Sequence, residues 1–210
     1  MFRVLIVDDH PVVRRGLREI LADERDIEVS EAADAHEALR LIREQRWSLV
    51  VLDINLPGRG GLELLKDVRR ERPRLPALIL SVYPEGQFAL RTLKAGASGF
   101  LSKDSAPEDL VSVVRKILKG GKYFGESVVE QLLCRPGAGG DSSNPHDTLS
   151  DRELQILCLI GRGKTVKEIA GELSLSPPTV STYRSRILEK MRLRTTAELV
   201  RYAVQNRLVN

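Results

Sequence analysis

The sequence contains few of the residues that build covalent or metal cross-links. It has 2 cysteines and 3 histidines in 210 residues. Cys134 and Cys158 lie too far apart in the sequence to form a paired-ligand motif. We therefore expect neither a structural zinc site nor a disulfide framework.

Long apolar runs are also missing. No stretch approaches the ~18 apolar residues that a membrane-spanning helix needs, and the first residues lack the pattern of a signal peptide. We therefore expect a cytoplasmic protein without a membrane partner. With 42% hydrophobic and 30% charged residues, the composition is typical of a globular protein, and the length favours two modest domains.

The charges are divided unevenly along the chain. Residues 1–147 hold 22 Lys and Arg against 23 Asp and Glu, whereas residues 148–210 hold 11 against 6. A small basic module beside a nearly neutral one suggests that the C-terminal part binds a polyanion. A well-solvated surface would show the same excess, so charge alone does not decide between the two interpretations.

Short apolar runs alternate with helical patterns in the first 120 residues. Strands are predicted at 3–7, 47–52, 77–80 and 99–101, with a weaker candidate at 27–29. Helices are predicted between them, from Pro11 onward and at 35–45, 61–71, 86–95 and 107–118. This alternation predicts an α/β doubly wound domain on a parallel five-stranded sheet.

Residues 121–147 are predicted to form a short helix at 126–133 and then a flexible linker rich in Gly, Ser and Pro. After it, capping boxes that begin at Ser150, Thr165 and Thr195 each predict a helix start.

A fourth helix is predicted at Ser176-Pro177. Four short helices, with the middle pair joined across Leu173-Ser174-Leu175, predict a helix-turn-helix domain. We therefore divide the chain into residues 1–120, 121–147 and 148–210.

Polar side chains stand where the predicted strands end. They are Asp8, Asp9, Asp53, Ser81 and Lys103. Ligands of such sheets bind at the carboxyl ends of the strands, so these side chains are expected to form one site. Clustered carboxylates repel one another unless a cation lies among them, and oxygen ligands of this kind suit Mg²⁺.

A carboxylate can also attack phosphorus and form an aspartyl phosphate. Asp53 stands alone between a strand and a loop and is the candidate nucleophile, while Asp8 and Asp9 would hold the metal. Taken singly, each residue has a plainer explanation, because an Asp at a strand end more often caps a helix and a lone Lys is usually a surface charge. Their combination in register favours a phosphoryl-transfer site.

Four segments carry these residues in a fixed order. They are Val7-Asp8-Asp9-His10, Leu52-Asp53-Ile54-Asn55-Leu56-Pro57-Gly58, Leu80-Ser81 and Gly99-Phe100-Leu101-Ser102-Lys103. In order and spacing they resemble the receiver domain of two-component response regulators. The resemblance implies that Asp53 accepts phosphate from a sensor histidine kinase. It also implies that Asp8, Asp9, Asp53 and the Asn55 main-chain carbonyl coordinate Mg²⁺, that Ser81 and Lys103 bind the phosphoryl oxygens, and that Phe100 reorients on activation.

The departures from the receiver pattern are small. Arg59-Gly60-Gly61 replaces the commoner pattern with an acid before the last glycine, which bears on the rigidity of the loop rather than on the chemistry. His10 is a possible metal ligand, but no second ligand accompanies it, so we interpret it as a helix-start residue. His36 and His146 are interpreted as solvated.

The C-terminal part carries a second set of motifs. They are Leu149-Ser150-Asp151-Arg152-Glu153, Lys167-Glu168-Ile169-Ala170, Leu175-Ser176-Pro177 and Thr179-Val180-Ser181-Thr182-Tyr183. These segments resemble the LuxR-type helix-turn-helix, so the whole chain is similar to the NarL/FixJ subgroup of response regulators. The resemblance implies that the helix from Pro177 to Met191 enters the major groove of double-stranded promoter DNA.

Helical spacing orients that helix. Val180, Tyr183, Ile187 and Met191 share the predicted buried side, and Pro178, Thr182, Ser185 and Glu189 lie opposite. DNA contacts are expected from Lys167, Thr179, Ser181, Thr182, Tyr183, Ser185, Arg186 and Lys190. Small polar residues can approach base edges, whereas the basic ones reach phosphates. Pro178 stands where the family usually has a polar or basic residue, so one contact is missing.

One recognition helix buries little surface, so tight specific binding normally uses two copies. We expect phosphorylation to promote a homodimer through a population shift, with Leu199, Val200 and Ala203 of the last helix contributing. The protein would then be a transcription regulator and not an enzyme beyond its own phosphoryl transfer.

Two other functions use parts of this pattern. A haloacid-type phosphatase also forms an aspartyl phosphate, but it usually needs a second Asp two residues past the nucleophile, where this chain has Asn55. A protein-interaction module would use the C-terminal helices for docking, with an incidental basic charge. Binding to genomic DNA fragments separates both from a transcription factor.

Overall fold

The computed structural model describes residues 1–83, 85–105, 107–125, 128 and 144–209. The chain divides into two compact units, Met1–Cys134 and Arg135–Asn210. The predicted helix at 126–133 and the predicted linker lie mostly outside the described residues. Among the residues that are described, no helix is both long and apolar enough to span a membrane.

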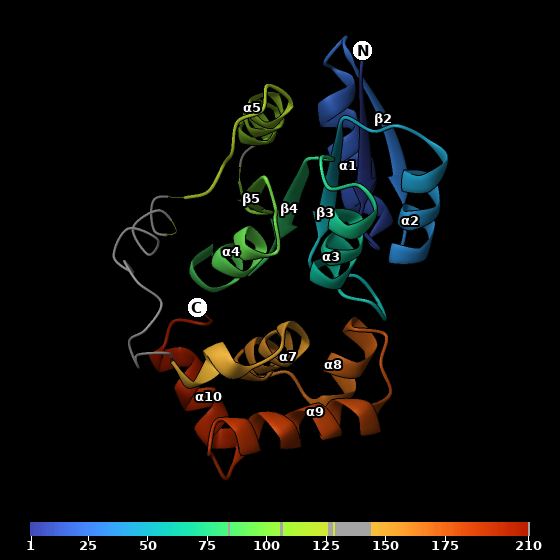
Figure 1. Ribbon diagram of the computed structural model, residues 1–210. Coiled ribbons are helices and arrows are strands. Elements are labelled where there is room, and N and C mark those ends of the chain that lie inside the picture. Colours follow the sequence, from blue (N-terminus) through green and yellow to red (C-terminus); the bar gives the residue numbers. More distant parts are fainter. Residues whose placement is uncertain (84, 106, 126–127, 129–143, 210) are drawn as a thin grey trace. The chain divides into compact units, whose positions relative to one another are not determined.

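Five strands form one parallel sheet in the first unit (Figure 1). They are β1 (Phe2–Val7), β2 (Ile27–Ala32), β3 (Leu49–Asp53), β4 (Ala77–Ser81) and β5 (Gly99–Ser102). Their order in the sheet is β2-β1-β3-β4-β5. Every residue of β3 and β4 is buried, which explains why both sequences are continuous apolar runs. The predicted α/β doubly wound fold is confirmed.

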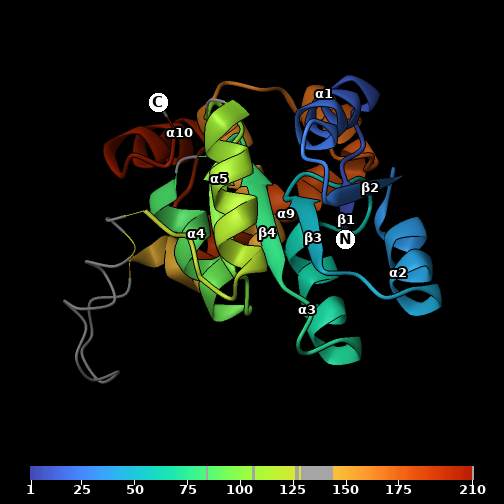
Figure 2. The same ribbon diagram turned by 90° about the horizontal axis from the view of Figure 1, so that it is seen from above.

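Helices cover both faces of this sheet (Figures 1 and 2). They are α1 (Pro11–Ala22), α2 (Ala35–Glu44), α3 (Gly61–Glu71), α4 (Glu85–Lys94) and α5 (Pro107–Leu118). Side chains of α1 and α5, such as Leu21 and Val113, form one buried cluster with Val4 and Val51 of the sheet. α2 and α3 contact each other on the opposite face.

The ends of two strands differ from the prediction. β2 is longer than the predicted 27–29, because it pairs with β1 along its whole length as far as Ala32. β3 begins at Leu49 instead of Trp47. The Trp47 indole N–H donates to the Leu41 carbonyl of α2 at 3.0 Å, so its side chain faces the helix end and not the sheet interior.

The second unit is helical. It contains a 3₁₀ turn, η1 (Pro145–Thr148), and the helices α7 (Asp151–Gly161), α8 (Val166–Glu172), α9 (Pro177–Lys190) and α10 (Thr196–Gln205). The predicted capping boxes at Ser150, Thr165 and Thr195 are all present. The turn between α8 and α9 places Ser174 at a φ of 51°, in the left-handed region that favours glycine. The predicted helix-turn-helix domain is confirmed.

The α10 face that was predicted to join two copies is already used within its own domain. Leu199 and Ala203 are fully buried, and α10 packs on α7. A Cβ added at Gly161 of α7 would lie only 2.6 Å from the Ala203 Cβ. Leu199 and Ala203 are therefore not available to a second copy, whereas Val200 is half-buried. Apolar spacing does not distinguish packing within a chain from packing between chains.

Candidate functional sites

The carboxyl edge of the sheet brings the predicted polar residues together. Asp53 and Ser81 are the last residues of β3 and β4, while Asp8 and Lys103 directly follow β1 and β5. Asp8 is 1% exposed, Asp53 2% and Ser81 0%. The first unit thus has a buried acidic pocket at the edge where ligands of such sheets bind.

Lys103 joins two of the carboxylates. Its Nζ lies 2.6 Å from Asp8 Oδ2 and 2.7 Å from Asp53 Oδ2. Burial raises the pKa of the Asp53 carboxyl, the charge of Lys103 opposes this, and the charge of Asp8 adds to it. Burial alone would lower the pKa of Lys103, but the two carboxylates overcome it and raise the pKa. Lys103 is therefore held as an ammonium ion.

The donor set fits a divalent cation. One ligand atom from each of Asp8, Asp9, His10 and Asp53 lies within 4.8 Å of all the others. Lys103 contacts the carboxylates of Asp8 and Asp53, and Asp9 adds a third carboxylate beside them. Clustered carboxylate oxygens of this kind suit Mg²⁺.

His10 directly precedes α1 as its N-cap residue, at the helix start as predicted, and it also reaches the pocket. Its main-chain N–H donates to Asp8 Oδ1 at 2.8 Å, and its ring Nδ1 lies 2.8 Å from Asp9 Oδ1. The side chain is 60% exposed, so the imidazole stands at the solvent side of the carboxylates.

Two residues position the pocket without having been predicted. A Cβ at Gly61 would lie 1.9 Å from the Asp53 carbonyl oxygen, so only glycine lets α3 start beside β3. Arg14 donates to the Asp8 carbonyl oxygen at 2.6 Å and pairs with Glu31 of β2. The glycine pair after β3 was a visible signal for the first. No local pattern marks Arg14, because it lies on α1 and its partner Glu31 lies on β2.

Ser81 and Phe100 lie within the packed interior. The Ser81 hydroxyl oxygen accepts the Tyr83 N–H at 2.9 Å, and the Ser81 carbonyl oxygen accepts the Lys103 N–H at 2.8 Å. Tyr83 is buried and stacks on Phe88 with ring centroids 4.7 Å apart. Phe100 is 1% exposed. A movement of one of these side chains therefore requires its neighbours to repack.

The second unit exposes the predicted face of α9. Val180, Ile187 and Met191 are buried, whereas Thr182 and Ser185 are exposed. The Thr182 hydroxyl donates to the Pro178 carbonyl at 3.0 Å, and the Ser185 hydroxyl donates to the Ser181 carbonyl at 3.1 Å. Each hydroxyl proton is thus used within the helix, and both oxygens keep lone pairs that can accept further hydrogen bonds.

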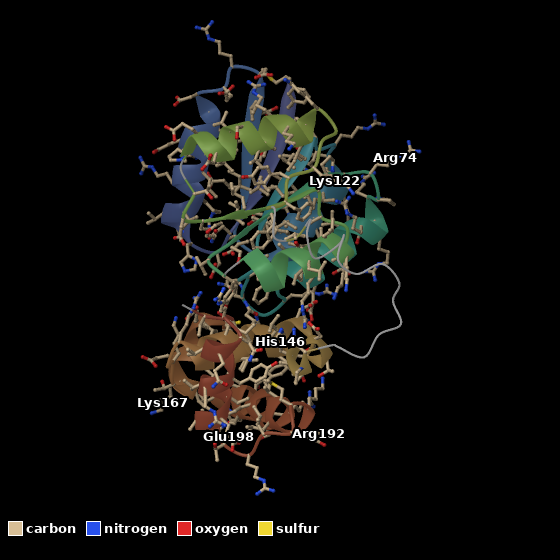
Figure 3. All side chains as sticks on the ribbon, turned by 90° about the vertical axis from the view of Figure 1, so that its left-hand side faces the viewer. Arg74, Lys122, His146, Lys167, Arg192 and Glu198 are labelled. Atoms are coloured by element: carbon tan, nitrogen blue, oxygen red, sulfur yellow. The ribbon has the colours of Figure 1, made fainter. Side chains whose placement is uncertain are left out.

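Basic residues flank this face. Lys167 on α8 and Arg186 on α9 are exposed, and the Lys167 side chain extends from the surface of the domain (Figure 3). Ser181 and Tyr183 are half-buried. Thr179 bonds through its hydroxyl to Ser176 Oγ at 2.7 Å, at the helix start.

Lys190, another predicted DNA contact, also holds the domain together. Its Nζ lies 2.7 Å from Glu153 Oε2 on α7, and the Glu153 side chain is only 4% exposed. Burial would raise the pKa of Glu153, but the hydrogen bonds from Lys190 and Ser150 lower it below its usual value. This ion pair fixes α9 against α7, a role that sequence spacing did not indicate.

His146 is buried and not solvated as predicted. It is 1% exposed, and its Nδ1 lies 2.7 Å from the Tyr202 hydroxyl of α10. The Pro- and Ser-rich surroundings of His146 have no apolar periodicity, so nothing in the local sequence indicates that η1 packs on a helix.

Family models match both parts of the chain. Residues 4–115 match the response regulator receiver domain, and residues 147–203 match the bacterial regulatory proteins of the luxR family.

Relatives cover the whole chain. Response regulator UvrY of Escherichia coli strain K12 is 36% identical over 211 residues, which span 100% of this chain and 97% of UvrY. Response regulator GacA of Pseudomonas aeruginosa is also 36% identical, over 100% of this chain and 99% of GacA. A solved complex of the two-component response regulator RcsB with DNA has 26% identity and a TM-score of 0.58, over 97% of this chain and 98% of RcsB. The chain therefore belongs to the NarL/FixJ subgroup of two-component response regulators, in which a receiver domain is joined to a LuxR-type DNA-binding domain.

Proposed function

We propose that Asp53 accepts a phosphoryl group from a sensor histidine kinase, and that this modification promotes a homodimer whose α9 helices bind promoter DNA. The contact of Lys103 with both Asp8 and Asp53 carries the proposal. It holds a buried carboxylate beside an ammonium group that can move to the incoming phosphoryl oxygens.

In the transfer step, an Asp53 carboxylate oxygen forms a bond to phosphorus as the bond between phosphorus and the histidine nitrogen breaks. The imidazole keeps the electron pair and takes up a proton. Lys103 exchanges its contact with Asp53 for the phosphoryl oxygens, and the Ser81 hydroxyl donates to another of them. Asp8, Asp9, Asp53 and the Asn55 main-chain carbonyl would hold Mg²⁺, which supplies positive charge beside the phosphoryl group.

Phosphorylation would then change the conformation of the residues packed around Ser81. A phosphoryl oxygen would accept the Ser81 hydroxyl proton, and a movement of that hydroxyl toward Asp53 would lengthen the hydrogen bond that its oxygen accepts from the Tyr83 N–H. The buried Phe100 on the neighbouring strand would reorient into the space that this movement leaves. The outcome is a shift of the receiver population toward a state that dimerises.

We assign residues 1–120 to the receiver domain, 121–147 to the connection and 148–210 to the DNA-binding domain, in a cytoplasmic protein that catalyses only its own phosphoryl transfer. The luxR-family match over residues 147–203 supports the third part. Tyr123 pairs with Gly99 of β5, which suggests that packing of the receiver continues slightly past residue 120.

Mass spectrometry after incubation with acetyl phosphate and Mg²⁺ tests the acceptor. We expect one added phosphoryl group, lost in Asp53→Asn and blocked by a chelator. Asp104→Asn is the matched control, since this exposed carboxylate stands next to Lys103 and its removal should leave labelling unchanged. Full labelling of Asp53→Asn would refute the assignment.

A further inference from the structure

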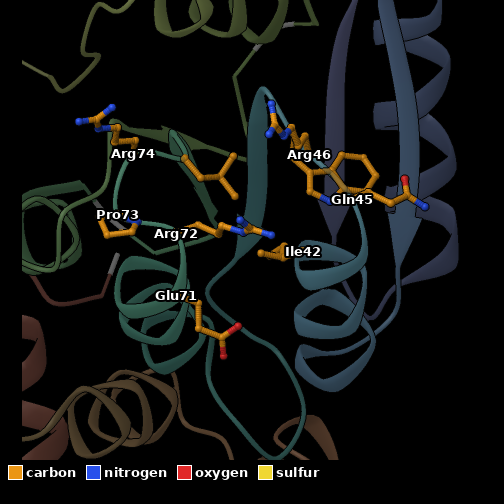
Figure 4. A pocket seen from close by; sticks show the side chains of 9 residues that line it. Ile42, Gln45, Arg46, Glu71, Arg72, Pro73 and Arg74 are labelled. Atoms are coloured by element: carbon orange, nitrogen blue, oxygen red, sulfur yellow. The ribbon is translucent and has the colours of Figure 1, made fainter.

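A second pocket lies at the opposite edge of the sheet from Asp53. Its volume is about 670 Å³, within the range of about 300–1,000 Å³ that is usual for small-molecule sites. It is lined by the ends of α2 and α3 and by the segments that lead into β3 and β4 (Figure 4). Neither phosphoryl transfer nor DNA binding uses these residues.

The pocket has apolar walls and one fixed aromatic ring. Ile42 and Leu75 line it and are buried, and the half-buried Trp47 lines it as well. The indole N–H of Trp47 is bonded to the Leu41 carbonyl oxygen. The Arg3 guanidinium lies 5.0 Å from the centroid of the Trp47 ring. A ring held in this way offers a planar apolar surface to another ring.

Positive charge surrounds these walls. Arg46, Arg72 and Arg74 line the pocket together with one acid, Glu71, whose charge is matched by a two-point ion pair with Arg43. Arg74 extends outward from the pocket mouth (Figures 3 and 4). The exposed guanidinium of Arg72 donates to the Arg43 carbonyl oxygen at 3.2 Å.

Arg46 is exposed, and within the described part of the chain it has no hydrogen-bond or ion-pair partner. It is therefore the guanidinium most readily offered to a ligand at this pocket.

The C-terminal ends of two helices at the pocket contribute partial negative charge, which is smaller than the positive charge of the arginines. α2 ends at Glu44 and α3 at Glu71, and each helix C-terminus is equivalent to about half a negative charge. Their carbonyl groups are partly neutralised already, because Leu41 accepts from Trp47 and Arg43 accepts from Arg72. Three lining guanidinium groups therefore outweigh two half charges.

We propose that this pocket binds a small anionic molecule that carries a planar apolar ring. The acid group is held by Arg46 and Arg72, and the ring packs against Trp47 between Ile42 and Leu75. The site is independent of phosphorylation at Asp53, since the two lie at opposite ends of β3.

Trp47 can serve as a spectroscopic probe of ligand binding at this pocket, because it is the only tryptophan in the sequence. The single indole N–H resonance in a ¹H–¹⁵N spectrum of the full-length protein is therefore that of Trp47. We would titrate the protein with 2-naphthoate and, separately, with 2-naphthamide, which has the same ring without the charge. Naphthoate should shift the Trp47 resonance in a saturable manner, and naphthamide should bind more weakly.

Variants separate this site from general binding to a basic surface. Arg46→Gln and Arg72→Gln should each weaken naphthoate binding by about two- to fivefold, as expected for exposed ion pairs. Arg25→Gln, which removes an exposed arginine of the same domain outside the pocket, should leave it unchanged. Equal binding of naphthoate and naphthamide, an unmoved Trp47 resonance, or equal loss in all three variants would each overturn the proposal.

Discussion

The acidic pocket places more negative charge around Asp53 than Lys103 can balance. Asp8 and Asp53 share the ammonium of Lys103, and Asp9 adds a third carboxylate. Burial and the charge of Asp8 both raise the pKa of Asp53. The ionised form of Asp53 is therefore less favourable in the folded protein than in a solvated carboxyl, as is common at functional sites.

We predict that Asp53→Asn stabilises the receiver domain by about 1 kcal/mol in metal-free buffer, because it removes one of the clustered charges. Mg²⁺ should raise the melting temperature of the native protein more than that of the variant, since a bound cation stabilises the state that binds it. Thermal unfolding with and without Mg²⁺ measures both effects. Equal shifts by Mg²⁺ would show that Asp53 takes no part in holding the metal.

Convergence of the pocket residues could be predicted because the ends of parallel strands share one edge of a sheet. The apolar runs that end at Asp53 and Ser81 mark those ends directly. Residues whose partners lie on distant elements could not be predicted in this way. Arg14 with Glu31, His146 with Tyr202, and Glu153 with Lys190 each depend on tertiary packing that leaves no periodic signal.

Among the elements, the turn between α8 and α9 contains backbone strain at Ser174 that a substitution can relieve. Ser174 adopts a φ of 51°, a conformation that costs a residue with a Cβ about 1 kcal/mol. Ser174→Gly should raise the free energy of unfolding of the DNA-binding domain by about 0.5 kcal/mol, after the greater chain entropy of glycine is subtracted. Ser174→Ala keeps the Cβ and should bring no gain. Urea denaturation followed by circular dichroism distinguishes the two, and a gain with alanine would contradict the explanation.

The contact between α7 and α9 should respond to acid. Since the pKa of Glu153 is lowered in the folded state, its ionised form stabilises folding above the unfolded pKa of about 4.3. That contribution is lost as the pH falls through the lower folded value.

Hydrogen exchange of the α7 amides between about pH 3 and 6 should therefore show a loss of protection on acidification that is smaller in Glu153→Gln. Glu189→Gln, an exposed change on α9, is the control and should keep the native profile. An unchanged acid response in Glu153→Gln would show that other carboxylates are responsible.

Different residues of α9 should control which DNA sequences are preferred and how tightly DNA of any sequence is bound. Thr182 and Ser185 carry no charge, so Thr182→Ala or Ser185→Ala should alter which sequences are preferred, at a cost of about 1–3 kcal/mol at the best site. Arg186→Ala should weaken all sequences alike and lower the salt-dependence slope by about 1. Selection from a randomised-site library at several salt concentrations measures both. A reshuffled preference in Arg186→Ala alone would reverse the orientation assigned to α9.

At the scale of the whole molecule, the chain carries its acceptor and its DNA-binding helix on separate compact units, Met1–Cys134 and Arg135–Asn210. A phosphoryl group at Asp53 can influence α9 only by changing how the units associate, within one chain or between two. The α10 face formed by Leu199 and Ala203 is buried in its own domain. The proposed dimer would therefore use surfaces other than these two buried side chains.

Sedimentation velocity of the full-length protein tests this coupling most directly. The native chain would be compared with Asp53→Asn and Asp104→Asn, each with Mg²⁺ and with or without acetyl phosphate. We predict that the native protein and Asp104→Asn change from monomer to dimer on phosphorylation, whereas Asp53→Asn remains a monomer under both conditions. A native protein that is stoichiometrically phosphorylated and still sediments as a monomer, even on saturating specific DNA, would contradict the account.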